Sequence, residues 1–257
     1  METRGVPLPS PPRFAPSERL VLACIQIATD VNFDTEGPAL LARVPGVNVR
    51  MAKIAFDSED ICAETYEEAF ANGKVRAAAD SLRLPEGYVT IWGIACTSFS
   101  FLIGRDRLLT QFPPGARLVT MWDGICSALR ALGAKSIAMI TPYIARVHES
   151  NVALMQERGF VVAQSMHLDL SRDLQVSGLD PAYLRGCIAA LAAAGPADAL
   201  FVGCSAFRVC LPGLLPELEA ELGMPVVTST QAFLWHALRS GGVNDRIEGY
   251  GRLFKEH

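Results

Sequence analysis

The sequence predicts an α/β protein made of two pseudo-symmetric lobes, each a four-stranded parallel sheet flanked by helices, with the active site in the cleft between them. Three observations favour this fold class. Short apolar runs alternate with segments of helical length, this order of elements occurs twice within the 257 residues, and the third apolar run of each half ends in a cysteine, Cys96 or Cys204. Such a duplication places equivalent loops on either side of a pseudo-twofold axis, which makes the cleft the expected ligand site.

The first predicted strand is the continuous apolar run 20–27, a pattern typical of strands that helices cover on both faces. The polar loop 28–32 follows, and its residues either contact a ligand or cap the helix whose first turn holds Asp34 and Glu36. The other elements predicted in this half are a strand at 47–54, a helix at 63–84, a strand at 88–94 that leads to Cys96, a short helix at 105–112 closed by Pro113-Pro114-Gly115, and a strand at 117–120.

The second half repeats the plan from Asp123, which is predicted to cap a helix that runs to Leu132 and ends at Gly133. Pro181 suits the first turn of a helix that continues to Ala194. The other elements predicted here are strands at 136–140, 160–166, 199–203 and 225–228, helices at 146–158, 216–222 and 231–239, and a loop at 169–175. We therefore expect one lobe to comprise residues 19–122 and 230–257 and the other residues 123–229, after a disordered leader at 1–18.

The composition excludes several classes of function. The formal net charge of −4 gives no electrostatic attraction for nucleic acid or for an anionic membrane surface. No apolar run is long enough to span a bilayer. The seven cysteines show neither CxxC spacing nor a cluster with histidines, so neither a disulfide framework nor a metal site is predicted, and we expect reduced thiols in a cytoplasmic protein.

Cys96 and Cys204 are the candidate functional thiols. Each follows an apolar strand and precedes small hydroxylated residues, a turn and a predicted helix. The carboxyl ends of parallel strands are where open α/β sheets place ligands. Free N–H groups at a helix N-terminus stabilise a thiolate, so we expect both cysteines to have lowered pKa values and to face one another across a pocket. The remaining cysteines are expected to be small core residues.

Four segments carry a resemblance to a known family: Cys96-Thr97-Ser98-Phe99-Ser100-Phe101, Thr141-Pro142-Tyr143, Ser171-Arg172-Asp173 and Val226-Val227-Thr228-Ser229-Thr230-Gln231-Ala232. They resemble the aspartate/glutamate racemase superfamily, in the branch that holds maleate cis–trans isomerase, the ectoine-utilisation proteins and arylmalonate decarboxylase. The resemblance covers about residues 20–242. It implies an enzyme without cofactor or metal, in which two cysteines flank a small carboxylic acid. Because the family commonly forms dimers, a homodimer is expected.

The resemblance also implies roles for individual side chains. The tyrosine that matches Tyr143 binds a substrate carboxylate in the family, and Asn32 resembles the asparagine of the family's first loop. Maleate isomerases carry asparagine where this chain has Asp173, and a carboxylate there would repel the second carboxylate of a dianion. The decarboxylase has glycine where this chain has Cys96.

Two reactions are consistent with a pair of thiols. In a racemase, one thiolate removes the proton next to a carboxylate and the other thiol returns a proton on the opposite face, while hydroxyl and backbone N–H groups stabilise the enediolate. In a cis–trans isomerase, a thiolate adds to a double bond, the resulting single bond rotates, and elimination follows. The predicted catalytic residues are Cys96 and Cys204, and the predicted substrate-binding residues are Thr97, Ser98, Tyr143, Ser205, Asn32 and Asp173.

Two alternatives remain at this point. A decarboxylase would need only Cys204, as the donor of a proton to the enediolate left after carbon dioxide departs, and the presence of Cys96 argues against it as the main activity. A protein of the same two-lobed plan that only binds small acids would be catalytically silent. Proton exchange from heavy water into candidate acids separates the enzyme from the binding protein.

Overall fold

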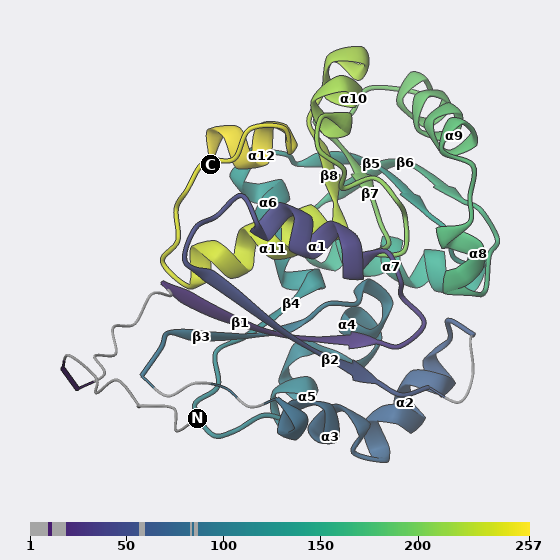
Figure 1. The fold of residues 1–257 in the computed structure, drawn as a ribbon. Helices are drawn as coiled ribbons and strands as arrows, with labels where there is room; N and C mark the ends of the chain where they lie inside the picture. The colour runs from purple at the N-terminus through teal and green to yellow at the C-terminus, as the bar shows by residue number, and fades with distance from the viewer. Residues whose placement is uncertain (1–9, 12–18, 57–59, 83, 85–86) are drawn as a thin grey trace, which may run out of the picture.

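The computed structural model describes residues 10–11, 19–56, 60–82, 84 and 87–257. The predicted leader at 1–18 therefore lies outside the described residues except for positions 10 and 11. The predicted architecture is confirmed: the chain forms two four-stranded parallel sheets with the strand orders β2-β1-β3-β4 and β6-β5-β7-β8, and helices flank both (Figure 1). Among the described residues, no helix is both long enough and apolar enough to cross a membrane.

The first sheet arises from the apolar runs of the first half. Its inner strand β1 is buried along its whole length and pairs with β2 and β3, as expected for a continuous apolar run. The strands are β1 (Leu20–Ile27), β2 (Val47–Ile54), β3 (Thr90–Ile94) and β4 (Leu118–Thr120). The helices between them are α1 (Phe33–Leu41), α2 (Ala63–Ala71), α3 (Lys74–Ser81), α4 (Thr97–Ile103) and α5 (Arg105–Leu109).

The second sheet has the same order, with β5 and β7 as its inner strands. Because β3 and β7 occupy equivalent inner positions, the cysteines beyond their carboxyl ends are also equivalent. The strands are β5 (Ser136–Thr141), β6 (Val161–His167), β7 (Ala199–Val202) and β8 (Val226–Thr228). The helices of this half are α6 (Met121–Ala131), α7 (Ala145–Glu157), α8 (Asp173–Ser177), α9 (Pro181–Ala193), α10 (Leu214–Leu222), α11 (Ser229–Ser240) and α12 (Gly251–Glu256).

Three sequence predictions need correction. The helix predicted at 63–84 is two helices, because Gly73 takes a left-handed φ of 68° between α2 and α3. Asp123 does not cap α6: Thr120 is the N-cap, its hydroxyl accepts from the Asp123 N–H at 3.1 Å, and Asp123 completes the capping box. The loop predicted at 169–175 contains the start of α8 at Asp173.

The segment after Cys204 is a further correction, since it forms turns and the next helix, α10, begins only at Leu214. The carbonyl of Ala206 accepts a hydrogen bond from the Asn32 side-chain amide, so it is not engaged in a helical turn. Gly213, with φ 86°, sets the chain direction just before α10. Of the two candidate thiols, Cys96 is therefore the one that lies at a helix N-terminus, as the N-cap residue of α4.

Helices α6 and α11 lie between the two sheets and join them (Figure 1). Helix α11 begins at Thr228 at the end of β8, in the second sheet, yet its Phe233 ring lies against Gly93 of β3 in the first. Helix α12, by contrast, packs on α10 and β8. The lobe boundaries given above remain our proposal, with α6 and α11 as the elements shared between the lobes.

The crossing of α6 and α11 gives a first testable prediction. A Cβ atom on Gly124 of α6 would lie 2.8 Å from the carbonyl oxygen of Ala232 and 2.8 Å from Cα of Phe233, both backbone atoms of α11. We expect Gly124→Ala to lower the free energy of unfolding by about 1–3 kcal/mol, because the helices must move apart. Urea denaturation followed by circular dichroism measures this.

Gly186→Ala is the matched control. Gly186 lies inside α9, and nothing within 4 Å would meet its added Cβ. The free energy of unfolding should rise by roughly 0.5–1 kcal/mol, because alanine favours the helix. Equal stability changes in both variants would show that Gly124 is not a close-packing position.

Candidate active site

Cys96 and Cys204 lie beyond the carboxyl ends of β3 and β7, and their side chains are almost completely buried, with exposed fractions of 2% and 4%. Two further groups, Tyr143 and Asp173, lie close enough to interact electrostatically with both cysteines. Both thiols raise the pKa of the Tyr143 hydroxyl, and the charge of Asp173 raises the pKa of both thiols. The structure therefore brings Cys96, Cys204, Tyr143 and Asp173 into one site, as expected for cysteines from equivalent strands.

Around Cys96, the side chains of α4 and its neighbours form a hydroxyl chain. The Ser98 hydroxyl lies 3.7 Å from the Cys96 sulfur and 2.8 Å from the Tyr66 hydroxyl of α2. The Thr97 hydroxyl instead donates to the sulfur of Met121 at 3.4 Å, which ties α4 to the start of α6. Of the two predicted substrate-binding hydroxyls in this loop, Ser98 is thus the one beside the thiol.

Around Cys204, backbone and amide groups hold the turn in place. The Ala206 N–H donates to the Cys204 sulfur at 3.4 Å, and the Asn32 amide holds the Ala206 carbonyl. Asn32 therefore fixes the Cys204 turn from the first loop of the other half. The buried Tyr143 hydroxyl lies within hydrogen-bonding reach of the Cys204 thiol, and this contact lowers the pKa of Cys204. The hydroxyl has no other partner among the described residues, so it can also contact a ligand.

Asp173 is the first residue of α8 and is buried, and its carboxylate accepts a hydrogen bond of 2.6 Å from the Thr29 hydroxyl. Burial, with a smaller contribution from the charge of Asp30, raises the pKa of Asp173 to about 7, although the hydrogen bond from Thr29 lowers it. The Asp173 carboxyl is therefore partly protonated at neutral pH and can donate a hydrogen bond.

Asp30 is a second buried carboxyl group beside the site. One of its oxygens accepts from the backbone N–H groups of Asn32 and Phe33 at 3.1 and 3.2 Å, which caps α1. Burial raises the pKa of Asp30, and the hydroxyl of Ser205 and these N–H groups lower it. The predicted residue Ser205 thus faces Asp30 rather than standing alone next to Cys204.

The expected thiolate character of the cysteines is not found. Burial raises the pKa of the Cys96 thiol and of the Cys204 thiol, and the charge of Asp173 raises both further. The Phe99 N–H at the start of α4 does lower the pKa of Cys96, as a helix N-terminus should, but loss of hydration outweighs it. Both thiols are therefore protonated at neutral pH.

Contacts between the two halves lie close in sequence to Tyr66 and Asp173. The Ile61 N–H donates to the Ser171 carbonyl at 2.8 Å, and Asp60 and Arg172 form an isolated antiparallel bridge beside it. These two contacts join the segment before α2 to the segment before α8, the helix that begins at Asp173. An ion pair of 3.5 Å between Glu64 and Arg146 adds a second link.

Sequence reasoning missed Thr29, Asp30 and Tyr66. The first two belong to the polar loop 28–32, for which ligand contact and helix capping were both open, and the structure divides the roles: Asp30 caps α1 and Thr29 contacts Asp173. Tyr66 gave no signal, because its place on the buried face of α2 is set by tertiary packing.

The family model described as arylmalonate decarboxylase matches residues 35–254. The chain belongs to the arylmalonate decarboxylase family. The arylmalonate decarboxylase of Bordetella bronchiseptica is 34% identical over 181 residues, which covers 68% of this chain and 75% of that protein. The maleate isomerase of Nocardia farcinica is 24% identical over 243 residues, or 89% of this chain and 93% of that protein.

A solved structure supports the same relationship. A cysteine-to-serine mutant of the Nocardia farcinica maleate cis–trans isomerase, with a covalently bound succinylcysteine intermediate, has the same fold, with a TM-score of 0.78, 22% identity, and coverage of 93% of this chain and 99% of that one. The superfamily predicted from the cysteine loops is thereby confirmed. This member of the arylmalonate decarboxylase family is an enzyme, related to isomerases and to a decarboxylase.

Proposed function

We propose that the protein is a cofactor-independent isomerase or racemase that acts on a small carboxylic acid through Cys96 and Cys204. The observation that carries this proposal is the placement of both thiols around Tyr143 and Asp173 in one buried site. The maleate isomerase relatives add support, and so does the cysteine adduct in the related solved structure. A second cysteine is not needed for decarboxylation, whereas it is needed for proton transfer on two faces of one carbon.

In the racemase form of the reaction, one cysteine first loses its proton to solvent, and the resulting thiolate takes the proton from the carbon next to the carboxylate. The electron pair of the broken C–H bond moves into the carboxylate and forms an enediolate. The hydroxyls of Tyr143 and Ser98 are placed to donate hydrogen bonds to its oxygens. The opposite thiol then donates its proton to the other face, so the two cysteines exchange protonation states.

The high thiol pKa values have a mechanistic meaning. A thiolate whose pKa is raised by burial is a stronger base than an exposed one, which helps with a weakly acidic C–H bond. Ionised Asp173 opposes formation of that thiolate, while protonated Asp173 does not. Asp173 also disfavours a dianion, so the proposed substrate carries one carboxylate and a neutral polar group that can accept from the Asp173 carboxyl.

A panel of chiral and unsaturated carboxylic acids in deuterium oxide, followed by NMR, tests the proposal. We expect deuterium at the carbon next to the carboxylate together with a change of configuration, or conversion of a cis to a trans alkene. Saturable binding with neither exchange nor interconversion for any acid in the panel would instead indicate a protein that only binds small acids.

Decarboxylation is the second candidate, favoured by the 34% identity to the Bordetella bronchiseptica enzyme. In this reaction Cys204 alone would protonate the enediolate left after carbon dioxide departs. We expect Cys96→Gly, which removes the thiol from one face, to release carbon dioxide from a disubstituted malonate and to give one enantiomer. Chiral chromatography measures this, and a racemic product would show that Cys204 is not the sole donor.

A further inference from the structure

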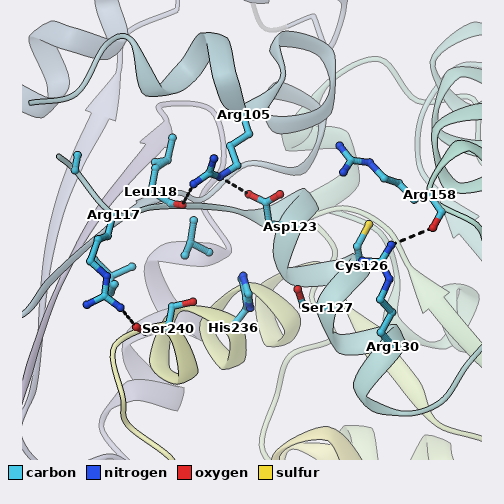
Figure 2. Close-up of a pocket in the computed structure, with 13 residues that line it drawn as sticks. Arg105, Arg117, Leu118, Asp123, Cys126, Ser127, Arg130, Arg158, His236 and Ser240 are labelled. Atoms are coloured by element: carbon cyan, nitrogen blue, oxygen red, sulfur yellow. Dashed lines mark hydrogen bonds and ion pairs between the residues drawn. The ribbon is translucent and has the colours of Figure 1, made fainter. Parts of the chain in front are cut away.

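A pocket of about 550 Å³ is lined by residues of the edge strand β4 and of helices α6 and α11 (Figure 2). Its lining includes none of Cys96, Cys204, Tyr143 and Asp173, so it is separate from the thiol site. The volume lies within the range of small-molecule sites.

Four arginines line this pocket, and we propose that it binds an organic anion with two or more carboxylate or phosphate groups. They are Arg105, Arg117, Arg130 and Arg158. One lining carboxylate, Asp123, forms an ion pair of 3.5 Å with Arg105 and also accepts hydrogen bonds from the N–H and hydroxyl of Thr120 at 3.3 and 2.9 Å. The result is a local excess of positive charge in a protein whose net charge is −4.

Three of the four arginines, Arg117, Arg130 and Arg158, form no ion pair with any described residue, whereas Arg105 pairs with Asp123 at 3.5 Å and with Asp106 at 3.8 Å. One N–H group of Arg105 donates to the Leu118 carbonyl at 3.3 Å, one of Arg117 to the Ser240 carbonyl, and one of Arg130 to the Arg158 carbonyl at 3.0 Å. Each guanidinium has five N–H donors, and a carbonyl carries no charge, so these bonds fix the side chains and leave donors for an anion.

Arg158 has a guanidinium group that is not engaged by the other described residues. Its guanidinium makes no hydrogen bond or ion pair with any residue that the structure describes, and it is close enough to lower the pKa of Cys126 in the pocket wall. In Figure 2 the side chain extends from the end of α7 toward Asp123. A planar guanidinium of this kind matches the two oxygens of a carboxylate or phosphate.

The remaining lining residues favour an organic rather than a simple inorganic ion. Ile91, Leu118 and Val119 supply apolar surface from β3 and β4, and the hydroxyls of Ser127 and Ser240 add neutral polar groups. An apolar wall next to several cations suits a carbon skeleton that bears separated anionic groups.

Isothermal titration calorimetry at low ionic strength tests the proposal, with citrate and inorganic pyrophosphate as probes and propionate as the monovalent comparison. We expect one equivalent of citrate or pyrophosphate to bind and propionate to bind at least about tenfold more weakly, because one charge engages fewer arginines. Tighter binding of citrate indicates a polycarboxylate site, and tighter binding of pyrophosphate a site for phosphorylated compounds. No binding of either probe overturns the proposal.

Variants distinguish anion binding in this pocket from nonspecific attraction and from binding in the thiol site. Arg158→Glu should weaken binding at least about tenfold, while Arg50→Glu, the same charge change at an exposed position of β2, and Cys204→Ala should not. Arg158→Gln removes the positive charge but retains a polar side chain, and it replaces Arg158→Glu if the charge reversal disturbs folding.

Equal weakening by Arg50→Glu would indicate nonspecific attraction, and loss of binding in Cys204→Ala would place the anion in the thiol site. A change from dimer to monomer in Arg158→Glu without any anion binding would make the pocket a subunit contact. Each of these three results overturns the proposal.

Discussion

Cys96→Ala and Cys204→Ala are each expected to lower the rate of racemisation or cis–trans conversion at least about a thousandfold, because a positioned proton-transfer group or nucleophile is removed. Both thiols adjoin Tyr143 and Asp173 in one buried site, so neither can replace the other on the opposite face of the substrate. A variant with one remaining thiol can still exchange a proton on its own face. Deuterium uptake without change of configuration, measured by NMR and chiral chromatography, is therefore its expected signature.

Cys187→Ala and Cys24→Ala are the controls for this pair. Cys187 is a partly exposed residue of α9, and Cys24 is fully buried inside β1. Both variants should retain turnover. If Cys96→Ala or Cys204→Ala converts substrate at the wild-type rate, the two-thiol mechanism is wrong.

Asp173→Asn should make both thiols about tenfold more reactive toward iodoacetamide at about pH 8, because the charge that opposes their thiolate forms is removed. The sign follows from the charge: above its pKa of about 7 Asp173 is ionised and raises the pKa of Cys96 and Cys204, and asparagine removes that charge. At about pH 5 Asp173 is protonated, so variant and wild type should alkylate at the same rate. Peptide mass spectrometry measures the modification of each cysteine.

Asp169→Asn is the matched control for this experiment. Asp169 lies on the same segment, is exposed, and has a φ of 57°, which asparagine also adopts readily. Burial slows the labelling of both thiols in every variant, so rates are compared as ratios to wild type. A similar gain of reactivity in Asp169→Asn, or a gain in Asp173→Asn that persists at about pH 5, would mean that the Asp173 charge does not control the thiols.

The inner strand β1 was predictable because burial on both faces of a parallel sheet requires continuous apolar residues, a local property of the chain. The partly alternating run 47–54 became the edge strand β2, and both strands have the predicted bounds. The equivalence of Cys96 and Cys204 was predictable for the same reason, since each follows the third apolar run of its half. Helix ends were predicted less well, since Thr120 and not Asp123 is the N-cap of α6. A capping box has a polar residue at the N-cap and another at N3, and the local sequence does not show which of the two is the N-cap.

By itself, the sequence determined the two-sheet fold, the two cysteines at strand ends and the family to which they belong, because periodicity and short motifs are local. Only the tertiary structure decided which groups meet there. Thr29 contacts Asp173 across 144 residues of chain. The segment after Cys204 forms a turn where a helix was predicted, and the Asn32 amide donates to its Ala206 carbonyl. The pKa direction of the thiols was also decided by tertiary structure: loss of hydration depends on the whole surroundings of a group, and here it outweighs the local effect of a helix N-terminus at Cys96.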